Sequence, residues 1–146
     1  MRVLVLHGPN LNLLGQREPE VYGHRTLAQI EEAMKRVGEE LTVELEHVQS
    51  QDEGELVTLI QGAAVRGFAG LVLNAGGFTH TSVAIRDALR ASSVPFVEVH
   101  VSNPIARESF RRRSLLSDLA IGVISGLGVH SYSLGLRGLV AALRDQ

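Results

Sequence analysis

The regular alternation of strand-like and helix-like segments restricts the fold of this chain more than any other feature. Short aliphatic or alternating runs typical of β-strands lie at 1–6, 41–48, 70–73, 95–101 and 119–124. Segments with helical character follow them at 26–41, 53–65, 81–91, 106–113 and 132–144. Strands that alternate with helices form a parallel sheet with helices on both faces. We therefore expect an α/β fold with a doubly wound, five-stranded parallel sheet.

Length and composition exclude several classes of protein. The 146 residues fit one domain, 1–146. The absence of cysteine excludes disulfides, cysteine-based zinc sites and thiolate nucleophiles. A net charge of −2 gives no electrostatic basis for binding nucleic acid or a membrane surface. No apolar run approaches the roughly 20 residues of a spanning helix, and no signal-peptide pattern is visible, so we expect a cytoplasmic protein.

The segments that directly follow the strands are the places to look for chemistry, because open α/β sheets bind ligands beyond the carboxyl ends of their strands. Segments 7–23, 74–82 and 100–104 hold most of the asparagines and half of the six histidines. The first is much longer than the usual loop of about 2–6 residues. It carries Arg17 and Tyr22. This length predicts a lid that closes over a ligand, with an ordinary surface loop as the alternative.

The other two segments offer a backbone cradle and a proton donor. Asn74 is followed by Ala-Gly-Gly and then a predicted helix, so backbone amides can approach an anion there. The spacing is not that of a dinucleotide or P-loop motif. His100 ends an apolar strand, and Glu98 lies on the same strand face, where a carboxylate can hold the ring as a proton donor. A structural His–Glu pair is the alternative. His80, at a helix start, is either a cap or a ligand contact.

The remaining histidines and an arginine run have simpler interpretations. His7, His24, His47 and His130 show no convergence with acidic residues, so we interpret them as structural or surface residues and expect no metal site. The run at 111–113 is all arginine. One of the three can face inward from a helical turn and bind a substrate carboxylate.

Several motifs together resemble the type II 3-dehydroquinate dehydratases. They are Gly8-Pro-Asn-Leu-Asn-Leu-Leu-Gly, Arg17-Glu-Pro with Tyr22-Gly, Asn74-Ala-Gly-Gly-Phe-Thr-His-Thr-Ser, Glu98-Val-His-Val-Ser-Asn and Gly126-Leu-Gly. The resemblance extends over essentially the whole chain. It implies a flavodoxin-like three-layer sandwich and a homododecamer built as a tetramer of trimers. It also implies dehydration of 3-dehydroquinate to 3-dehydroshikimate in the shikimate pathway to chorismate and aromatic amino acids, without metal, cofactor or covalent intermediate.

The resemblance also implies roles for individual residues. Tyr22 is the base that removes the proton next to the ketone, and Arg17 stabilises its phenolate. His100 is the acid that protonates the departing hydroxyl, Glu98 orients it, and Asn10 lies near the developing enolate. The implied substrate contacts are Asn74, His80, Val101, Ser102 and Arg111, with Asp87 reaching the site of a neighbouring subunit.

The sequence departs from the family pattern at Pro104-Ile105, Arg113 and Ser131, none of which has an implied catalytic role. Two other classes of protein share this kind of fold. A signalling receiver or regulator needs acidic residues at the ends of strands one and three, where this chain has His7 and Asn74. A flavin or nucleotide carrier needs a Ser/Thr-rich phosphate loop after strand one, which is absent.

Overall fold

A parallel sheet of five strands organises the computed structural model, which describes residues 1–146. The strands are β1 (Arg2–His7), β2 (Glu44–Gln49), β3 (Gly70–Asn74), β4 (Phe96–His100) and β5 (Gly122–Ser125). All neighbouring pairs are parallel, and the order across the sheet is β2-β1-β3-β4-β5. This is the strand order of flavodoxin-like, doubly wound sheets, so the predicted fold class is confirmed.

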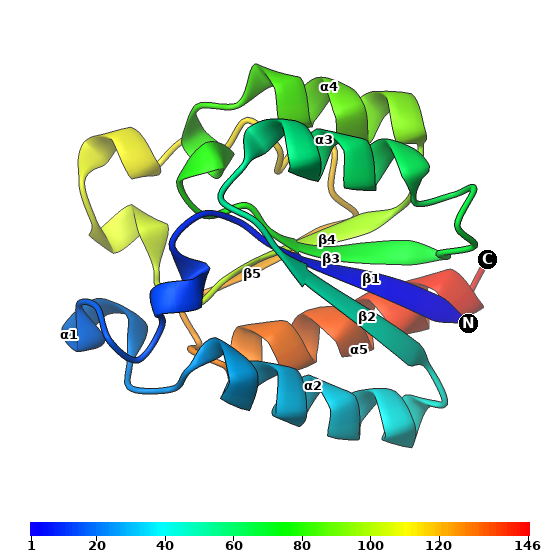
Figure 1. Ribbon diagram of the computed structural model, residues 1–146, viewed down its shortest axis with the longest axis horizontal. Coiled ribbons are helices and arrows are strands. Elements are labelled where there is room, and N and C mark those ends of the chain that lie inside the picture. The colour runs from blue at the N-terminus through cyan, green and yellow to red at the C-terminus, as the bar shows by residue number, and fades with distance from the viewer.

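Four helices complete the three layers. Figure 1 shows α2 (Leu27–Leu41) and α5 (His130–Arg144) on one face of the sheet, and α3 (Glu53–Gly62) and α4 (Val83–Ser92) on the other. A shorter helix, α1 (Pro19–Tyr22), lies in the long segment after β1. No helix combines the length and the apolar character needed to cross a membrane.

The core consists of one hydrophobic cluster on each side of the sheet. Along β1, Val3 and Val5 join the cluster beneath α2 and α5, whereas Leu4 and Leu6 join the cluster beneath α3 and α4. This division follows from the period of two in strand side chains. β3 and β4 are also buried along their whole length. Burial on both faces explains why the central strands appear in the sequence as continuous apolar runs.

Side-chain caps determine where the longer helices begin. Thr26 and Gln29 form a reciprocal capping box at the start of α2. Asp52 and Ser82 accept hydrogen bonds from the first-turn amides of α3 and α4. These caps place the observed helix starts within two residues of the predicted ones.

The predicted helix over 106–113 is wrong. This segment instead contains two short 3-10 helices, η3 (Pro104–Ala106) and η4 (Ser109–Arg111). Pro104 begins η3 directly after the Asn103 cap, and Arg107 then adopts an extended backbone with φ −107° and ψ −158°. The extended residue prevents the two turns from joining into one helix. The last strand is also later than predicted, because residues 119–121 lie in a turn before β5.

Gly8 holds the segments after β1 and β3 together at the carboxyl edge of the sheet. Its amide donates to the Asn74 carbonyl at 2.7 Å. A Cβ atom on Gly8 would lie only 2.4 Å from the Ala75 carbonyl oxygen. Only glycine permits this backbone approach, which brings two of the predicted site segments side by side.

Gly8→Ala is therefore expected to destabilise the fold by about 1–3 kcal/mol, because the clash is with backbone that has to shift. Urea denaturation followed by circular dichroism measures this change. Gly138→Ala is the control, since a Cβ there meets open space within α5. Alanine at that helical position should stabilise by about 0.5–1 kcal/mol. Equal stability of Gly8→Ala and the unmodified protein would contradict the packing argument.

Candidate active site

A cleft lies at the carboxyl edge of the sheet, between the segments that follow β1, β3 and β4. Its volume is about 670 Å³, counting the part open to solvent, which suits a small-molecule ligand. Figure 1 shows α1 and the turns between β4 and β5 at this same end of the sheet. The predicted site residues that line the cleft are Asn10, Arg17, Tyr22, Asn74, His80, His100, Val101, Ser102 and Arg111.

Two guanidinium groups lie against the Tyr22 ring. The Arg17 guanidinium carbon is 4.8 Å from the ring centroid, and its Nη2 is 3.4 Å from the tyrosine hydroxyl. The Arg107 guanidinium carbon lies 5.0 Å from the same centroid, and its Nη1 donates to Ser102 Oγ at 3.2 Å. Cations within about 6 Å of an aromatic ring are attracted to its face. The structure thus places two fixed positive charges beside the tyrosine of the cleft.

Arg107 is a cleft residue that sequence reasoning missed. It follows η3, and the turn made by Pro104 and the extended backbone of Arg107 direct its side chain back toward Tyr22. In the sequence, Arg107 is one of several arginines that follow the predicted fourth strand, and nothing distinguishes it from the run at 111–113. Because a helix was expected over 106–113, the sequence did not predict that Arg107 turns back toward Tyr22.

His100 and Glu98 form a buried pair at the end of β4. His100 Nε2 donates to Glu98 Oε2 at 2.9 Å, and the Ser114 and Ser117 hydroxyls also donate to this carboxylate. Burial raises the pKa of Glu98, but the hydrogen bond and charge of His100 and the two serine hydroxyls outweigh it, so the pKa is lowered. Glu98 therefore stays ionised and holds the ring, as the strand-face argument predicted. His100 lines the cleft, whereas Glu98 lies behind it.

The cleft residues after β3 are also oriented by hydrogen bonds. Asn74 Nδ2 donates to the Tyr132 hydroxyl at 3.1 Å, and Asn74 Oδ1 accepts from the Gly76 amide at 3.1 Å. His80 Nδ1 donates to the Arg113 carbonyl at 2.8 Å, which leaves Nε2 for a ligand. His80 is thus a cleft residue and not a helix cap, because Ser82 caps α4.

Asp87 does not reach this cleft. It is exposed on α4 and borders a separate hollow with Arg86 and Arg113. Its expected contribution to the site of a neighbouring subunit remains a prediction.

The long segment after β1 is folded and anchored. It contains the 3-10 helix η1 (Leu11–Leu13) as well as α1, and Leu11 and Leu14 are buried in the core cluster beneath α2 and α5. Tyr22 packs against the same cluster. The segment covers one side of the cleft, as expected for a lid; its closure over a ligand remains a prediction.

The expectation that His7 and His47 show no convergence with acidic residues is wrong, because Glu31 lies close to both. The two histidines also join a chain of polar groups. Asn74 Nδ2 donates to the Tyr132 hydroxyl, which can then donate to His7 Nδ1 at 2.9 Å. His7 Nε2 lies 3.0 Å from His47 Nδ1, and the two rings stack at 5.3 Å between centroids. His47 stands opposite Val5 on the neighbouring strand, so the β1–β2 register brings it diagonally beside His7.

Glu31 lies close to His7 and His47. One possible metal-ligand atom from each of these three residues lies within 4.8 Å of the other two. Both ring nitrogens of His7 are already hydrogen-bonded, however. The arrangement is therefore better described as a buried hydrogen-bond chain that leads to Asn74 than as a metal centre. It gives His7 and His47 a structural role beneath the cleft.

Burial keeps both of these histidines neutral. It lowers the pKa of His7 to about 3, with a further contribution from His47, and lowers the pKa of His47 to about 4. An unfolded histidine titrates near pH 6.5. Below that pH the unfolded chain binds more protons than the folded one, so stability falls as the pH falls from about 6.5 toward 4.

We predict that His47→Gln makes this pH dependence shallower, by up to about 1.4 kcal/mol per pH unit between pH 6 and 5. Urea denaturation at a series of pH values measures the slope for the unmodified protein and the variant. His130→Gln, at an exposed histidine, is the control and should leave the slope nearly unchanged. A slope unaffected by His47→Gln would show that His47 is not held neutral in the folded state.

The chain is similar to known proteins in both sequence and structure. A family model described as "Dehydroquinase class II" matches residues 1–140. A 3-dehydroquinate dehydratase of Bordetella avium is 58% identical over 135 residues, which cover 92% of this chain and 94% of that protein. One of Prochlorococcus marinus (strain MIT 9301) is 53% identical over 143 residues, which cover 98% of this chain and 97% of that protein.

Solved structures agree with these matches. A type II dehydroquinase from Butyrivibrio crossotus superimposes with a TM-score of 0.93 at 38% identity, covering 95% of this chain and 97% of that one. One from Propionibacterium acnes has a TM-score of 0.90 at 38% identity, covering 96% of both chains.

Proposed function

The chain belongs to the class II dehydroquinase family and is an enzyme that dehydrates 3-dehydroquinate in the shikimate pathway, and we propose that Tyr22 is its base and His100 its acid. The observation that carries this proposal is the presence in one cleft of a tyrosine with two guanidinium groups against its ring and a histidine held by a buried carboxylate. Because the chain belongs to this family, the alternative functions of signalling receiver and flavin or nucleotide carrier are no longer needed.

Tyr22 removes the proton from the carbon next to the ketone. A tyrosine has an ordinary pKa of about 10, so only about one in a thousand is ionised at pH 7, a deficit of roughly 4 kcal/mol. We assign Arg17, whose Nη2 lies 3.4 Å from the tyrosine hydroxyl, and Arg107 to stabilising the transition state, in which negative charge is shared with the tyrosine oxygen. The proton passes to the phenolate oxygen, and the electron pair of the broken C–H bond forms an enolate.

The enolate needs hydrogen-bond donors fixed around its oxygen. Asn10 lines the cleft, and its backbone is in the left-handed region at φ 68°. The backbone N–H of Asn10 donates to Gln51 Oε1 at 2.7 Å. We assign Asn10 to the developing enolate, directly or through a water molecule. The hydrogen bond to Gln51 fixes the backbone of Asn10 before the substrate arrives.

His100 protonates the hydroxyl group as it leaves. Hydroxide is a poor leaving group, so the C–O bond breaks as a proton is delivered and the group departs as water. Glu98 occupies Nε2 of His100, which leaves Nδ1 for this transfer. The enolate electrons then form the carbon–carbon double bond. Tyr22 then releases its proton to solvent, and His100 takes up a proton from solvent. Both residues are thereby restored for the next turnover.

The substrate's hydroxyls and carboxylate are assigned to the remaining cleft residues: Asn74, His80, Val101, Ser102 and Arg111. Arg111 donates through Nε to Glu108 Oε2 at 3.0 Å, which leaves its two terminal nitrogens for a substrate carboxylate. Gly76 and Gly77 also line the cleft, and the Gly76 amide is already hydrogen-bonded to Asn74 Oδ1.

The wider setting follows from the family resemblance. We propose that residues 1–146 form a single catalytic domain, working without cofactor in the cytoplasm as a homododecamer of four trimers. In that assembly Asp87 contributes to a neighbouring site. Mass measurement in solution tests the assembly, and a monomer that is fully active would contradict it.

We expect the purified protein to convert 3-dehydroquinate to a conjugated enone, seen as a rise in ultraviolet absorbance. The rise should persist after treatment with a chelator. Folded protein that produces no such signal at any neutral or mildly alkaline pH would contradict the assignment.

Tyr22→Phe and Arg17→Ala are expected to lower kcat by about 10²–10⁴-fold, the usual contribution of a positioned base, while KM changes only a few-fold. Steady-state kinetics on 3-dehydroquinate measure both constants. Arg36→Ala, at an exposed arginine on α2, is the control and should leave both unchanged. Near-normal kcat in Tyr22→Phe would show that another group is the base.

A further inference from the structure

We propose that Ser114 and Ser117 are positioning residues for the acid step: they hold the Glu98 carboxylate that orients His100. We propose further that the Arg86–Asp118 ion pair fixes the loop that carries them. The inference rests on the proposed role of His100 as the acid. Residues 114–118 are called the serine loop below.

Both oxygens of the Glu98 carboxylate are held. Ser114 Oγ donates to Oε1 at 2.8 Å, and Ser117 Oγ donates to Oε2 at 2.8 Å. Oε2 also accepts from His100 at 2.9 Å. Glu98 is only 1% exposed, so water contributes little to its solvation. Without the serines this buried charge would have the histidine as its single partner and would be able to rotate away from it.

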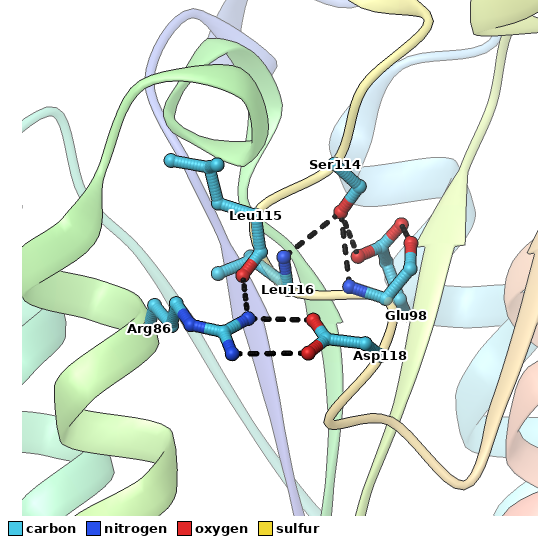
Figure 2. A network of polar contacts seen from close by, with 7 residues as sticks. Arg86, Glu98, Ser114, Leu115, Leu116 and Asp118 are labelled. Carbon is cyan, nitrogen blue, oxygen red and sulfur yellow. Dashed lines mark hydrogen bonds and ion pairs between the residues drawn. The ribbon is translucent and has the colours of Figure 1, made fainter.

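The direction of the Ser114 hydroxyl bond is fixed by its other partners. A serine hydroxyl has one proton to donate and two lone pairs that accept. Ser114 Oγ accepts from the backbone amides of Leu116 and Ser117, each at 3.1 Å. Its proton is therefore left for Glu98, and Figure 2 shows Ser114 between Leu116 and Glu98. The turn that forms the serine loop thus orients the donor.

The serine loop is attached to the segment that leads from β3 into α4. Arg86 on α4 binds Asp118 through two contacts of 2.5 and 3.0 Å and donates to the Leu115 carbonyl at 2.7 Å, as Figure 2 shows. The Leu115 amide donates to the Thr79 carbonyl at 2.9 Å, and Leu116 is fully buried. These contacts hold the loop at Leu115, Leu116 and Asp118.

The charges around Glu98 support this role. His100 is the only titratable side chain bonded to Glu98, because Arg86 and Asp118 are paired with each other. Burial raises the pKa of Glu98, and His100 and the two hydroxyls together lower it below its ordinary value. The serines therefore help to keep the carboxylate ionised as well as oriented.

Neither serine lines the cleft, so neither is placed to contact the substrate. Loss of a serine hydroxyl should consequently affect the rate of the chemical step and not substrate binding. This separates the proposed role from a contribution to the binding site.

Ser117→Ala is the sharper test, because Glu98 is the sole partner of the Ser117 hydroxyl, whereas Ser114 also supports the turn. We expect kcat to fall about tenfold with KM changed less than twofold. Ser117→Thr, which keeps the hydroxyl, should recover most of kcat. Unchanged kcat in Ser117→Ala, or equal losses in the alanine and threonine variants, would overturn the proposal.

A double-mutant cycle with Glu98→Gln tests whether the serine acts through the carboxylate. In the Glu98→Gln background, Ser117→Ala should lower kcat by less than about twofold, because the group it acts through has been removed. A further tenfold loss in that background would overturn the proposal.

Asp118→Ala provides a second variant at an exposed position, where the substitution leaves no cavity in the core. It should lower kcat about threefold without changing KM, and an unchanged kcat would overturn the role of the ion pair.

The unmodified protein in the same assay distinguishes failure of the proposed function from failure of the positioning role. If it lacks dehydratase activity, the proposed function fails. If it is active and Ser117→Ala is equally active, only the positioning role fails.

Discussion

Parallel pairing of strands that are buried on both faces is the constraint on which the rest of this structure depends. Each parallel pair needs a crossover that returns the chain to the opposite edge, through helices elsewhere and through short 3-10 turns between β4 and β5, so all five carboxyl ends lie at one edge. Residues distant in sequence, such as Tyr22, Asn74 and His100, consequently line one cleft. The close approach of Gly8 to Ala75 then brings the first two of these segments into contact. The cleft is thus a product of topology and of one tight backbone contact.

Two groups at the cleft have very different surroundings. Tyr22 is only partly buried, and the guanidinium groups of Arg17 and Arg107 lie against its ring. Glu98 is fully buried, so its charge would be costly without donors, and hydroxyls and His100 supply them. Both groups belong to the arrangement on which the proposed roles of Tyr22 as base and His100 as acid rest.

The sequence predicted the parts of this arrangement that depend on local pattern. Apolar runs located the strands, and strand-face periodicity paired Glu98 with His100. It did not predict features that depend on tertiary register. The His7–His47 contact arises from the offset between β1 and β2, and Arg107 reaches Tyr22 only because Pro104 and an extended residue break the expected helix. The serine loop has no periodicity, so nothing in the sequence linked Ser114 to Glu98.

The assignment of Tyr22 as the base and His100 as the acid can be tested by solvent exchange of the proton on the carbon next to the ketone. In deuterated water His100→Ala should still exchange that proton of 3-dehydroquinate, faster than without enzyme, while forming almost no product. Tyr22→Phe should show neither exchange nor product. The opposite pattern, exchange in Tyr22→Phe and none in His100→Ala, would contradict the assignment of base and acid.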